Sequence, residues 1–327
     1  MKYNFCTLFD RNYLYKGVTL YNSLVQHCPD FTLWILCMDG PTYKVLEKLN
    51  LEKAFLIKIC DFEDEALRVV KPTRSVAEYC WTCTPSLPLY VLKNNPSLEM
   101  ITYLDADLFF YSDPFPIFSE MGNASILIVE HRFPEHLKEL NVNGIYNVSV
   151  VAFRNNAEGM ECLKWWRDRC NEWCYYRLED GKLGDQKYLD DWPDRFHGVH
   201  VLQHKGAGVA LWNVMRYTTR EVGGKTFIDE KPLIVYHFHQ FQMLKNNSYD
   251  YGARGHYFLT EENIRTIYTP YVAEIERSVK LVREVAPRFR YGYTEIKHSS
   301  LTDILRRIFR TVLSQIKIRL KKKTKEI

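Results

Sequence analysis

The chain has 327 residues, of which 46% are hydrophobic and 26% are charged. This composition is that of a globular protein with a large core and excludes an intrinsically disordered chain. Charge is uneven: residues 301–327 hold nine basic and two acidic side chains, whereas residues 1–300 hold 35 basic and 38 acidic ones. A mildly acidic body argues against a broad nucleic-acid-binding surface, which needs a basic face, so we expect no nucleic-acid partner.

The cysteines and the first residues indicate a compartment. The nine cysteines are an odd number, and the opening residues run straight into a strand-like segment without a charged-then-apolar leader. We therefore expect a cytoplasmic protein. Because no stretch reaches the roughly 18 apolar residues that cross a bilayer, any membrane contact is expected to be peripheral, on the inner face of the cytoplasmic membrane.

Strand and helix patterns alternate along the first sixty residues. Strands are predicted at 3–9, 32–37 and 54–60, and helices at 12–26 and 43–49. This alternation predicts an α/β fold with a mostly parallel central sheet.

The alternation continues beyond residue 60. Helices are predicted at 78–93 and 162–176, and strands at 100–104, 125–129, 147–153 and 233–238. From about residue 247 the pattern changes to Tyr-rich loops and long helical periodicity, at 261–285 and again at 301–320. We therefore predict a main domain at 1–246, a Tyr-rich helical extension at 247–298 and a basic amphipathic helix with its tail at 299–327.

Two carboxylates follow the predicted strand at 100–104. Asp105 and Asp107 stand at the carboxyl end of that strand, the edge at which parallel sheets bind ligands. Their position after an apolar strand indicates a bound cation, because burying both charges uncompensated is costly. Carboxylate oxygens suit Mg²⁺ or Mn²⁺. The alternative is a solvent-exposed turn, since Asp-x-Asp also occurs by chance.

The sequence Tyr103-Leu-Asp-Ala-Asp107 resembles the donor-binding motif of the GT-A sugar transferases. It is most similar to glycosyltransferase family 8, which includes glycogenin and bacterial lipopolysaccharide galactosyltransferases, and the resemblance extends in order over residues 3–240. It implies a Rossmann-like GT-A fold with helices on both faces of the sheet, and residues 1–246 as the catalytic domain. It also implies that Mn²⁺ or Mg²⁺ binds the diphosphate of a nucleotide sugar.

Two further segments resemble donor-binding parts of that family. In the opening segment, the resemblance implies that Thr7, Asp10 and Tyr13 contact the base and ribose. An Asp at such a strand-to-helix turn is also a common helix cap. In the strand at 146–150, the resemblance implies that Asn147 faces the donor sugar, although Val and Ser here replace the family's Ser and Gly.

The Asp185-Gln186 pair resembles a catalytic pair of the family. The resemblance implies that Asp185 binds donor-sugar hydroxyls, that Gln186 lies beside the anomeric carbon, and that the anomeric configuration is retained. If the reaction instead inverts the configuration, Asp190 or Asp191 is the first candidate for the base. The alternative for Asp185 is a structural role at a helix start, where the helix dipole favours an acidic side chain.

A third metal ligand is expected from the strand at 233–238. Val-Tyr-His237-Phe matches the strand-borne His-Phe of the family, and the resemblance implies that His237 binds the metal. His239 is a rival for this role, and a buried structural histidine is the alternative. The family's following Gly and Lys-Pro are missing here, so the lysine that binds the diphosphate is expected to be Lys245 or Lys205, the latter in a Gly-rich loop.

The cysteines at 80, 83, 170 and 174 have partly zinc-like spacing. They lie on predicted helices among aromatic residues, which favours buried free thiols over a zinc site.

The basic tail predicts a partner. Apolar residues recur at helical spacing over 301–320 with basic residues between them, and a Lys cluster follows. A basic amphipathic helix of this kind predicts adsorption of residues 301–325 to an anionic membrane surface. The alternative is a helix packed on the body. A membrane location would suit a lipid-linked acceptor.

These features together predict a metal-dependent glycosyltransferase. It would transfer a hexose from a nucleotide-diphosphate sugar, expected to be a UDP-sugar, to a glycan or lipid-linked acceptor in surface polysaccharide or lipopolysaccharide synthesis. One alternative is a non-catalytic membrane- or nucleic-acid-binding protein with a degenerate transferase core. A phosphatase that uses Asp105 and Asp107 is disfavoured, because the phosphatase motif follows the first strand and continues with Thr or Val, whereas Leu108 follows here.

Overall fold

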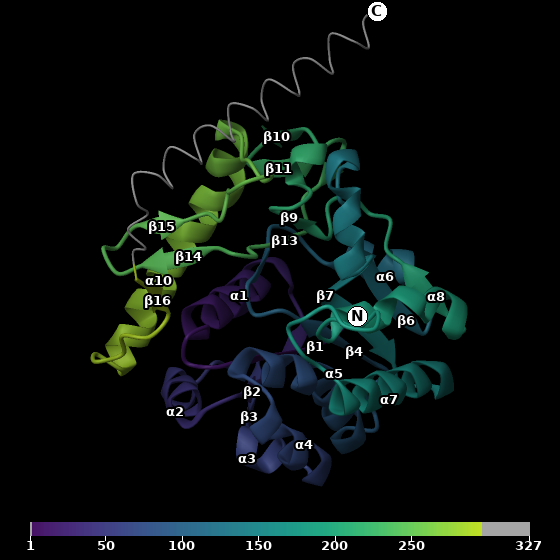
Figure 1. Ribbon diagram of the computed structural model, residues 1–327. Coiled ribbons are helices and arrows are strands. Elements are labelled where there is room, and N and C mark those ends of the chain that lie inside the picture. Colours follow the sequence, from purple (N-terminus) through teal and green to yellow (C-terminus); the bar gives the residue numbers. More distant parts are fainter. Residues whose placement is uncertain (1, 296–327) are drawn as a thin grey trace, which may run out of the picture.

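A computed structural model describes residues 2–295 and contains a seven-stranded central sheet (Figure 1). The strand order is β3-β2-β1-β4-β7-β6-β8. All neighbours pair in parallel except at β7, which runs antiparallel to both β4 and β6. The sheet strands are β1 (Tyr3–Phe9), β2 (Phe31–Cys37), β3 (Ala54–Lys58), β4 (Met100–Leu104), β6 (Ile126–Glu130), β7 (Tyr146–Arg154) and β8 (Val199–Val201).

Both faces of this sheet are covered by helices. On β1, Phe5 and Phe9 face one apolar cluster while Cys6 and Leu8 face another, because successive side chains of a strand point to opposite faces. The first cluster is closed by α1 (Leu14–His27), α2 (Gly40–Leu49) and α10 (Thr269–Val285), and the second by α5 (Val76–Asn94) and α7 (Ala157–Glu172). The predicted α/β class, with a mostly parallel sheet and helices on both faces, is therefore confirmed.

Shorter elements connect these layers. The short helices are α3 (Ile59–Phe62), α4 (Glu65–Val70), α6 (Phe115–Met121), α8 (Trp192–Arg195) and α9 (Glu261–Asn263), with 3₁₀ or π segments at Lys71–Thr73, Glu135–Asn143, Gln186–Asp191, Val214–Arg216 and Ile264–Tyr268. The short strands are β5 (Leu108–Phe110), β9 (Val209–Ala210), β10 (Thr219–Val222), β11 (Lys225–Ile228), β12 (Lys231–Pro232), β13 (Val235–His237), β14 (Gln242–Leu244), β15 (Tyr249–Asp250) and β16 (Tyr293–Thr294).

Local capping explains where helix ends differ from the predicted ones. The helix predicted at 162–176 begins five residues earlier, at Ala157, because the Asn156 side chain caps it by accepting a hydrogen bond from Gly159 N. It also ends earlier, at Glu172. The helix predicted at 78–93 begins at Val76, since Ser75 and Glu78 form a capping box.

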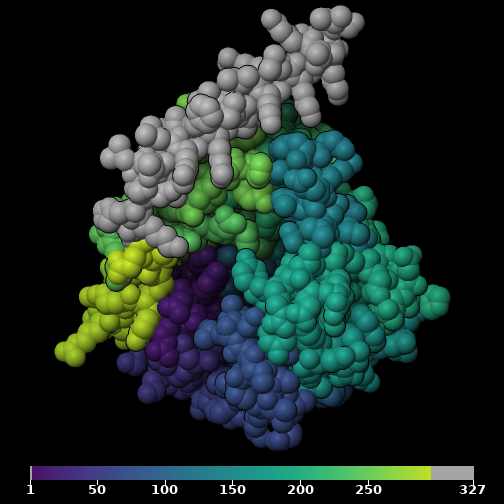
Figure 2. Space-filling view, viewed as in Figure 1, coloured from purple at the N-terminus to yellow at the C-terminus, as the bar shows by residue number. Residues whose placement is uncertain are grey.

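The segment after residue 247 packs on the N-terminal helix. Helix α10 lies against α1, where Thr19 Oγ1 and Ser278 Oγ are 2.8 Å apart and Asn22 Nδ2 donates to Glu274 Oε1 at 2.7 Å. Figure 2 shows the end of the described chain, in yellow, against the purple N-terminal part. The division at residue 246 stays a prediction, although apolar residues from both sides of it share one core cluster.

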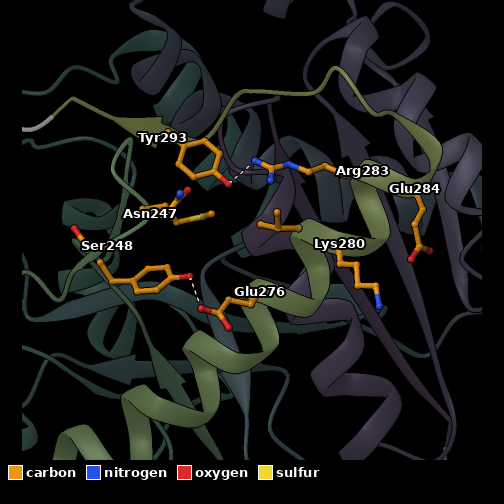
Figure 3. A pocket seen from close by; sticks show the side chains of 10 residues that line it. Asn247, Ser248, Glu276, Lys280, Arg283, Glu284 and Tyr293 are labelled. Carbon is orange, nitrogen blue, oxygen red and sulfur yellow. Dashed lines mark hydrogen bonds between the residues drawn. The ribbon is translucent and has the colours of Figure 1, made fainter.

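A cavity of about 560 Å³ lies between α10 and the small sheet of β14, β15 and β16 (Figure 3). Tyr249 OH donates to Glu276 Oε1 at 3.0 Å and Arg283 Nη2 donates to Tyr293 OH at 3.0 Å across its wall. None of the expected site residues lines this cavity. Its acidic and basic side chains are equal in number, so their charges do not select a ligand of either sign.

The predicted basic helix at 301–325, the tail domain at 299–327 and the membrane surface expected to bind them lie outside the described residues. Within residues 2–295, the helices are too short or too polar to span a bilayer.

Replacing Gly159 with Ala should destabilise the fold. An ideal Cβ at this position would overlap the carbonyl oxygen of Arg154 and lie 3.1 Å from that of Ser125, where α7 crosses the ends of β6 and β7. Because both obstacles are backbone atoms, we expect Gly159→Ala to lower the free energy of unfolding by about 1–3 kcal/mol in urea titrations followed by circular dichroism. Gly40→Ala is the control, since its Cβ would meet nothing within 4 Å; equal losses in both variants would contradict the packing argument.

Candidate metal and donor site

Asp105 and Asp107 occupy a tight turn between β4 and β5. Asp105 N donates to Ser149 O at 3.0 Å, which extends the pairing of β4 with β7, and Leu108 N donates back to Asp105 O at 3.2 Å. The side chain of Asp107 is 10% exposed and that of Asp105 is 31% exposed. The turn therefore presents two carboxylates at the carboxyl edge of the sheet, as the sequence predicts.

His237 reaches the same point through a second, smaller sheet. Strand β13 pairs antiparallel with β5, which places His237 opposite Leu108, and Phe238 N donates to Asp107 O at 2.9 Å. Figure 1 shows β9 and β13 of this sheet set apart from the central one. Trp212 packs edge-on against the His237 ring, with 5.2 Å between ring centroids. The position of this histidine is thus fixed by backbone pairing on one side and aromatic packing on another.

The three side chains form a compact set of donor atoms. His237 Nε2 lies 3.0 Å from Asp107 Oδ1 and 3.7 Å from Asp105 Oδ2, and one donor atom from each residue lies within 4.8 Å of the others. Ligands about 2.1 Å from a Mg²⁺ ion lie about 3 Å apart when adjacent and about 4 Å when opposite. The residues therefore fit a divalent cation such as Mn²⁺ or Mg²⁺, and among residues 2–295 this is the one such cluster.

The pKa values of the three triad residues shift in different directions. Burial raises the pKa of Asp105 to about 6, with the neighbouring Asp107 adding to the shift and His237 opposing it. Burial also acts to raise the pKa of Asp107, but His237 and Lys16 outweigh it and hold that pKa below its ordinary value. Conversely, burial acts to lower the pKa of His237, and Asp107 and Asp105 reverse this and raise it. Protons and a metal ion therefore compete for the same three groups.

His239, the rival ligand, is not part of the cluster. It is exposed, and its Nε2 lies 3.4 Å from the amide nitrogen of Gln240. Of the two histidines, only His237 directs a ring nitrogen at both carboxylates within 4 Å.

Asp185 lies close enough to Asp105 for their charges to interact. It is buried, its carbonyl oxygen accepts from Trp166 Nε1 at 2.9 Å, and burial with the nearby Asp105 raises its pKa to about 7. Gln186 begins the following 3₁₀ segment, and its side-chain amide donates to Asn143 O at 2.9 Å. The charge of Asp185 thus interacts with that of Asp105, while the side-chain amide of Gln186 contacts the end of the 3₁₀ segment Glu135–Asn143.

The two candidate bases for an inverting reaction are both in ion pairs. Asp190 pairs with Lys187 at 2.6 Å and accepts from Ile145 N at 2.7 Å. Asp191 pairs with Arg195 at 2.5 Å.

The remaining expected donor-binding residues have varied surroundings. Thr7 is fully buried in the middle of β1, and Asp10 accepts from Asn12 N at 2.8 Å. Tyr13 is 44% exposed beside the triad. Asn147 is buried on β7, and its side chain accepts from Ser149 and donates to Val129 O at 3.3 Å. Of these four residues, Tyr13 has the largest exposed surface next to the triad.

The expected diphosphate lysines both pair with surface carboxylates. Lys205 Nζ lies 3.0 Å from Asp229 and 3.4 Å from Glu230, and Lys245 pairs with Glu295. A lysine that the sequence reasoning missed, Lys16, lies instead 3.6 Å from Asp107 Oδ2. One sequence signal could have found it, because Lys16 is the sole Lys, Arg, Asp or Glu in residues 14–27, the span of the buried helix α1.

The four cysteines with zinc-like spacing are free thiols, as are the other five. None of them belongs to a potential metal cluster in the described part of the chain.

Replacing Asp185 with Asn should change how stability depends on pH. The folded-state pKa of about 7 exceeds the ordinary value of 3.8, so the wild type binds an extra proton when folded and loses stability as pH rises from about 4 to 7. The amide of Asp185→Asn does not ionise in this pH range, so the variant lacks this loss of stability. We expect the variant to exceed the wild type in unfolding free energy at pH 8 by more than about 1 kcal/mol, since each pKa unit is worth about 1.4 kcal/mol. Urea titrations at pH 5 and pH 8 measure this, and a difference between proteins that does not grow with pH would refute it.

The two histidines can be separated by metal titration. We expect His237→Ala to weaken Mn²⁺ binding by at least about tenfold in isothermal calorimetry, because a direct ligand is lost. His239→Ala is the matched control and should bind Mn²⁺ like the wild type. The reverse order of effects would assign the ligand to His239.

Two curated proteins of Bacillus subtilis (strain 168) are similar to this chain. The uncharacterized protein YfnD is 33% identical over 295 residues, which cover 89% of this chain and 94% of YfnD. The uncharacterized protein YfnF is 37% identical over 251 residues, which cover 74% of this chain and 83% of YfnF. No protein-family model matches the chain.

Solved structures give more distant similarities. The galactosyltransferase LgtC, in complex with donor and acceptor sugar analogs, is 12% identical with a TM-score of 0.48, covering 86% of this chain and 95% of LgtC. The glycosyltransferase GlyE of Streptococcus pneumoniae TIGR4 is 14% identical with a TM-score of 0.48, covering 89% of this chain and 65% of GlyE. By its sequence identity and coverage, the chain belongs to the same protein family as YfnD and YfnF of Bacillus subtilis.

Proposed function

We propose that this protein is a metal-dependent glycosyltransferase that uses a nucleotide-diphosphate sugar. The observation that carries the proposal is the convergence of Asp105, Asp107 and His237 at the carboxyl edge of a mostly parallel sheet. Ligands of such sheets bind at this edge, and a two-carboxylate, one-imidazole set suits a divalent ion that keeps coordination positions for phosphate oxygens.

The residues of the site have distinct roles in this proposal. Asp105, Asp107 and His237 hold the cation, which when bound would supply Lewis-acid neutralisation of the departing nucleoside diphosphate. Tyr13, half-exposed beside the triad, is available for the nucleotide. Asp185 would bind sugar hydroxyls, and its raised pKa suits a hydrogen-bonding group that is partly protonated near neutral pH.

We propose that the reaction retains the anomeric configuration, with Gln186 beside the anomeric carbon. The ion pairs of Asp190 with Lys187 and of Asp191 with Arg195 support this, because both carboxylates of the candidate bases already contact a cationic side chain. A UDP-hexose donor, a glycan or lipid-linked acceptor, a role in surface polysaccharide or lipopolysaccharide synthesis and the binding of residues 301–325 to an anionic membrane stay predictions.

Turnover of nucleotide sugars tests the proposal. We expect the wild type to release nucleoside diphosphate from at least one member of a nucleotide-sugar panel with Mn²⁺, and to stop when the metal is chelated. Asp107→Ala should lower this rate by about a hundredfold or more, because a metal ligand is lost. The exposed Asp168→Ala on α7 is the control. A rate that is independent of metal, or unchanged in Asp107→Ala, would exclude this function.

A further inference from the structure

A buried lysine, Lys16, lies next to Asp107 of the triad. Lys16 lies in the first turn of α1, is 8% exposed, and places Nζ 3.6 Å from Asp107 Oδ2. The same ammonium lies 4.4 Å from the centre of the half-exposed Tyr13 ring. Lys16 therefore lies between a metal ligand and an aromatic side chain that solvent reaches.

The positive charge of Lys16 disfavours binding of a metal ion alone at the triad. His237 faces Oδ1 of Asp107, and Lys16 faces Oδ2. A buried ammonium repels a divalent ion and is costly to desolvate, so it weakens the site for metal alone. Two carboxylates, one lysine and one divalent ion leave a unit of positive charge, which an anionic ligand would neutralise.

The other two candidate lysines form ion pairs with carboxylates outside the triad. Lys205 pairs with Asp229 and Glu230, and Lys245 pairs with Glu295. Within residues 2–295, Lys16 is the only Lys or Arg whose ion pair reaches a member of the triad. The cation that a diphosphate would meet next to the metal ion thus comes from the N-terminal helix.

We propose that Lys16 binds the diphosphate of the nucleotide sugar together with the triad's metal ion. This inference rests on the proposed function. Lys16 would exchange part of its contact with Asp107 for a phosphate oxygen. Tyr13, the residue before α1, and Lys16, in its first turn, would then both contact the nucleotide diphosphate. The chemical class of ligand is a nucleoside diphosphate or pyrophosphate in complex with a divalent ion.

Binding measurements on Lys16→Met test this role without relying on activity. The probes are Mn²⁺ alone, Mn²⁺ with pyrophosphate, Mn²⁺ with the nucleoside diphosphate that binds the wild type most tightly in a panel, and the corresponding nucleoside. We expect the affinity of Lys16→Met for both diphosphate probes to fall by about tenfold or more, the scale of a lost charge-assisted contact. Binding of Mn²⁺ alone should be unchanged or tighter, and binding of the nucleoside unchanged.

Two variants serve as references. Lys164→Met removes an exposed lysine on α7 and should bind every probe like the wild type. Lys16→Gln repeats the charge removal with a polar side chain if Lys16→Met is poorly folded, and binding of Mn²⁺ alone reports an intact triad in either variant.

These measurements distinguish a wrong role for Lys16 from a wrong proposed function. If Lys16→Met binds the diphosphate probes like the wild type, or loses Mn²⁺ alone in the same proportion, Lys16 is only the counter-charge of Asp107 and the inference is wrong. Loss of diphosphate binding in Lys205→Met or Lys245→Met, with Lys16→Met unaffected, would reassign the role. If the wild type itself binds no nucleoside diphosphate with Mn²⁺, the proposed function fails along with this inference.

Discussion

The site depends on the antiparallel pairing of β5 with β13. Asp105 and Asp107 end one strand of the central sheet, but the third donor comes about 130 residues later in the chain and reaches them because His237 pairs opposite Leu108. The hydrogen bond from Phe238 N to Asp107 O fixes the two segments at the point where the carboxylates emerge. Backbone hydrogen bonds buried in this way hold ligand atoms within the narrow distances that a cation demands.

Several buried ionisable groups surround this pairing. Asp107 is buried, Asp105 and Asp185 have raised pKa values because of burial, and Lys16 is buried beside Asp107. Burial costs each group desolvation energy; for Asp105 the charge of His237 offsets only part of this cost, whereas for Asp107 the charges of His237 and Lys16 outweigh it. Clusters of perturbed ionisable groups at the ligand-binding edge of a sheet are typical of functional sites, where unliganded stability is lower than the same packing could achieve.

Helix α10, in the C-terminal part of the described chain, packs against the segments that carry the site residues. Helix α10 packs on α1, the helix that carries Lys16, and Phe238, next to His237, stacks on Tyr271 of α10 with 3.5 Å between ring centroids. Residues after 247 therefore pack against both the helix that carries Lys16 and the segment that carries His237. The buried apolar residues of α10 share one cluster with those of α1 and of one face of β1.

The sequence by itself determined the order of the long strands and helices, the mostly parallel character of the sheet and the carboxylates after β4, because apolar periodicity and turn chemistry are local properties. It also singled out His237, through a motif. Only the tertiary structure decided that His237 rather than His239 faces the carboxylates, that Lys205 and Lys245 pair with surface acids, and that Lys16 lies beside Asp107. The physical reason is that side-chain partners across a fold are set by strand register and helix packing, which bring together residues far apart in the chain and leave no periodic trace in its sequence.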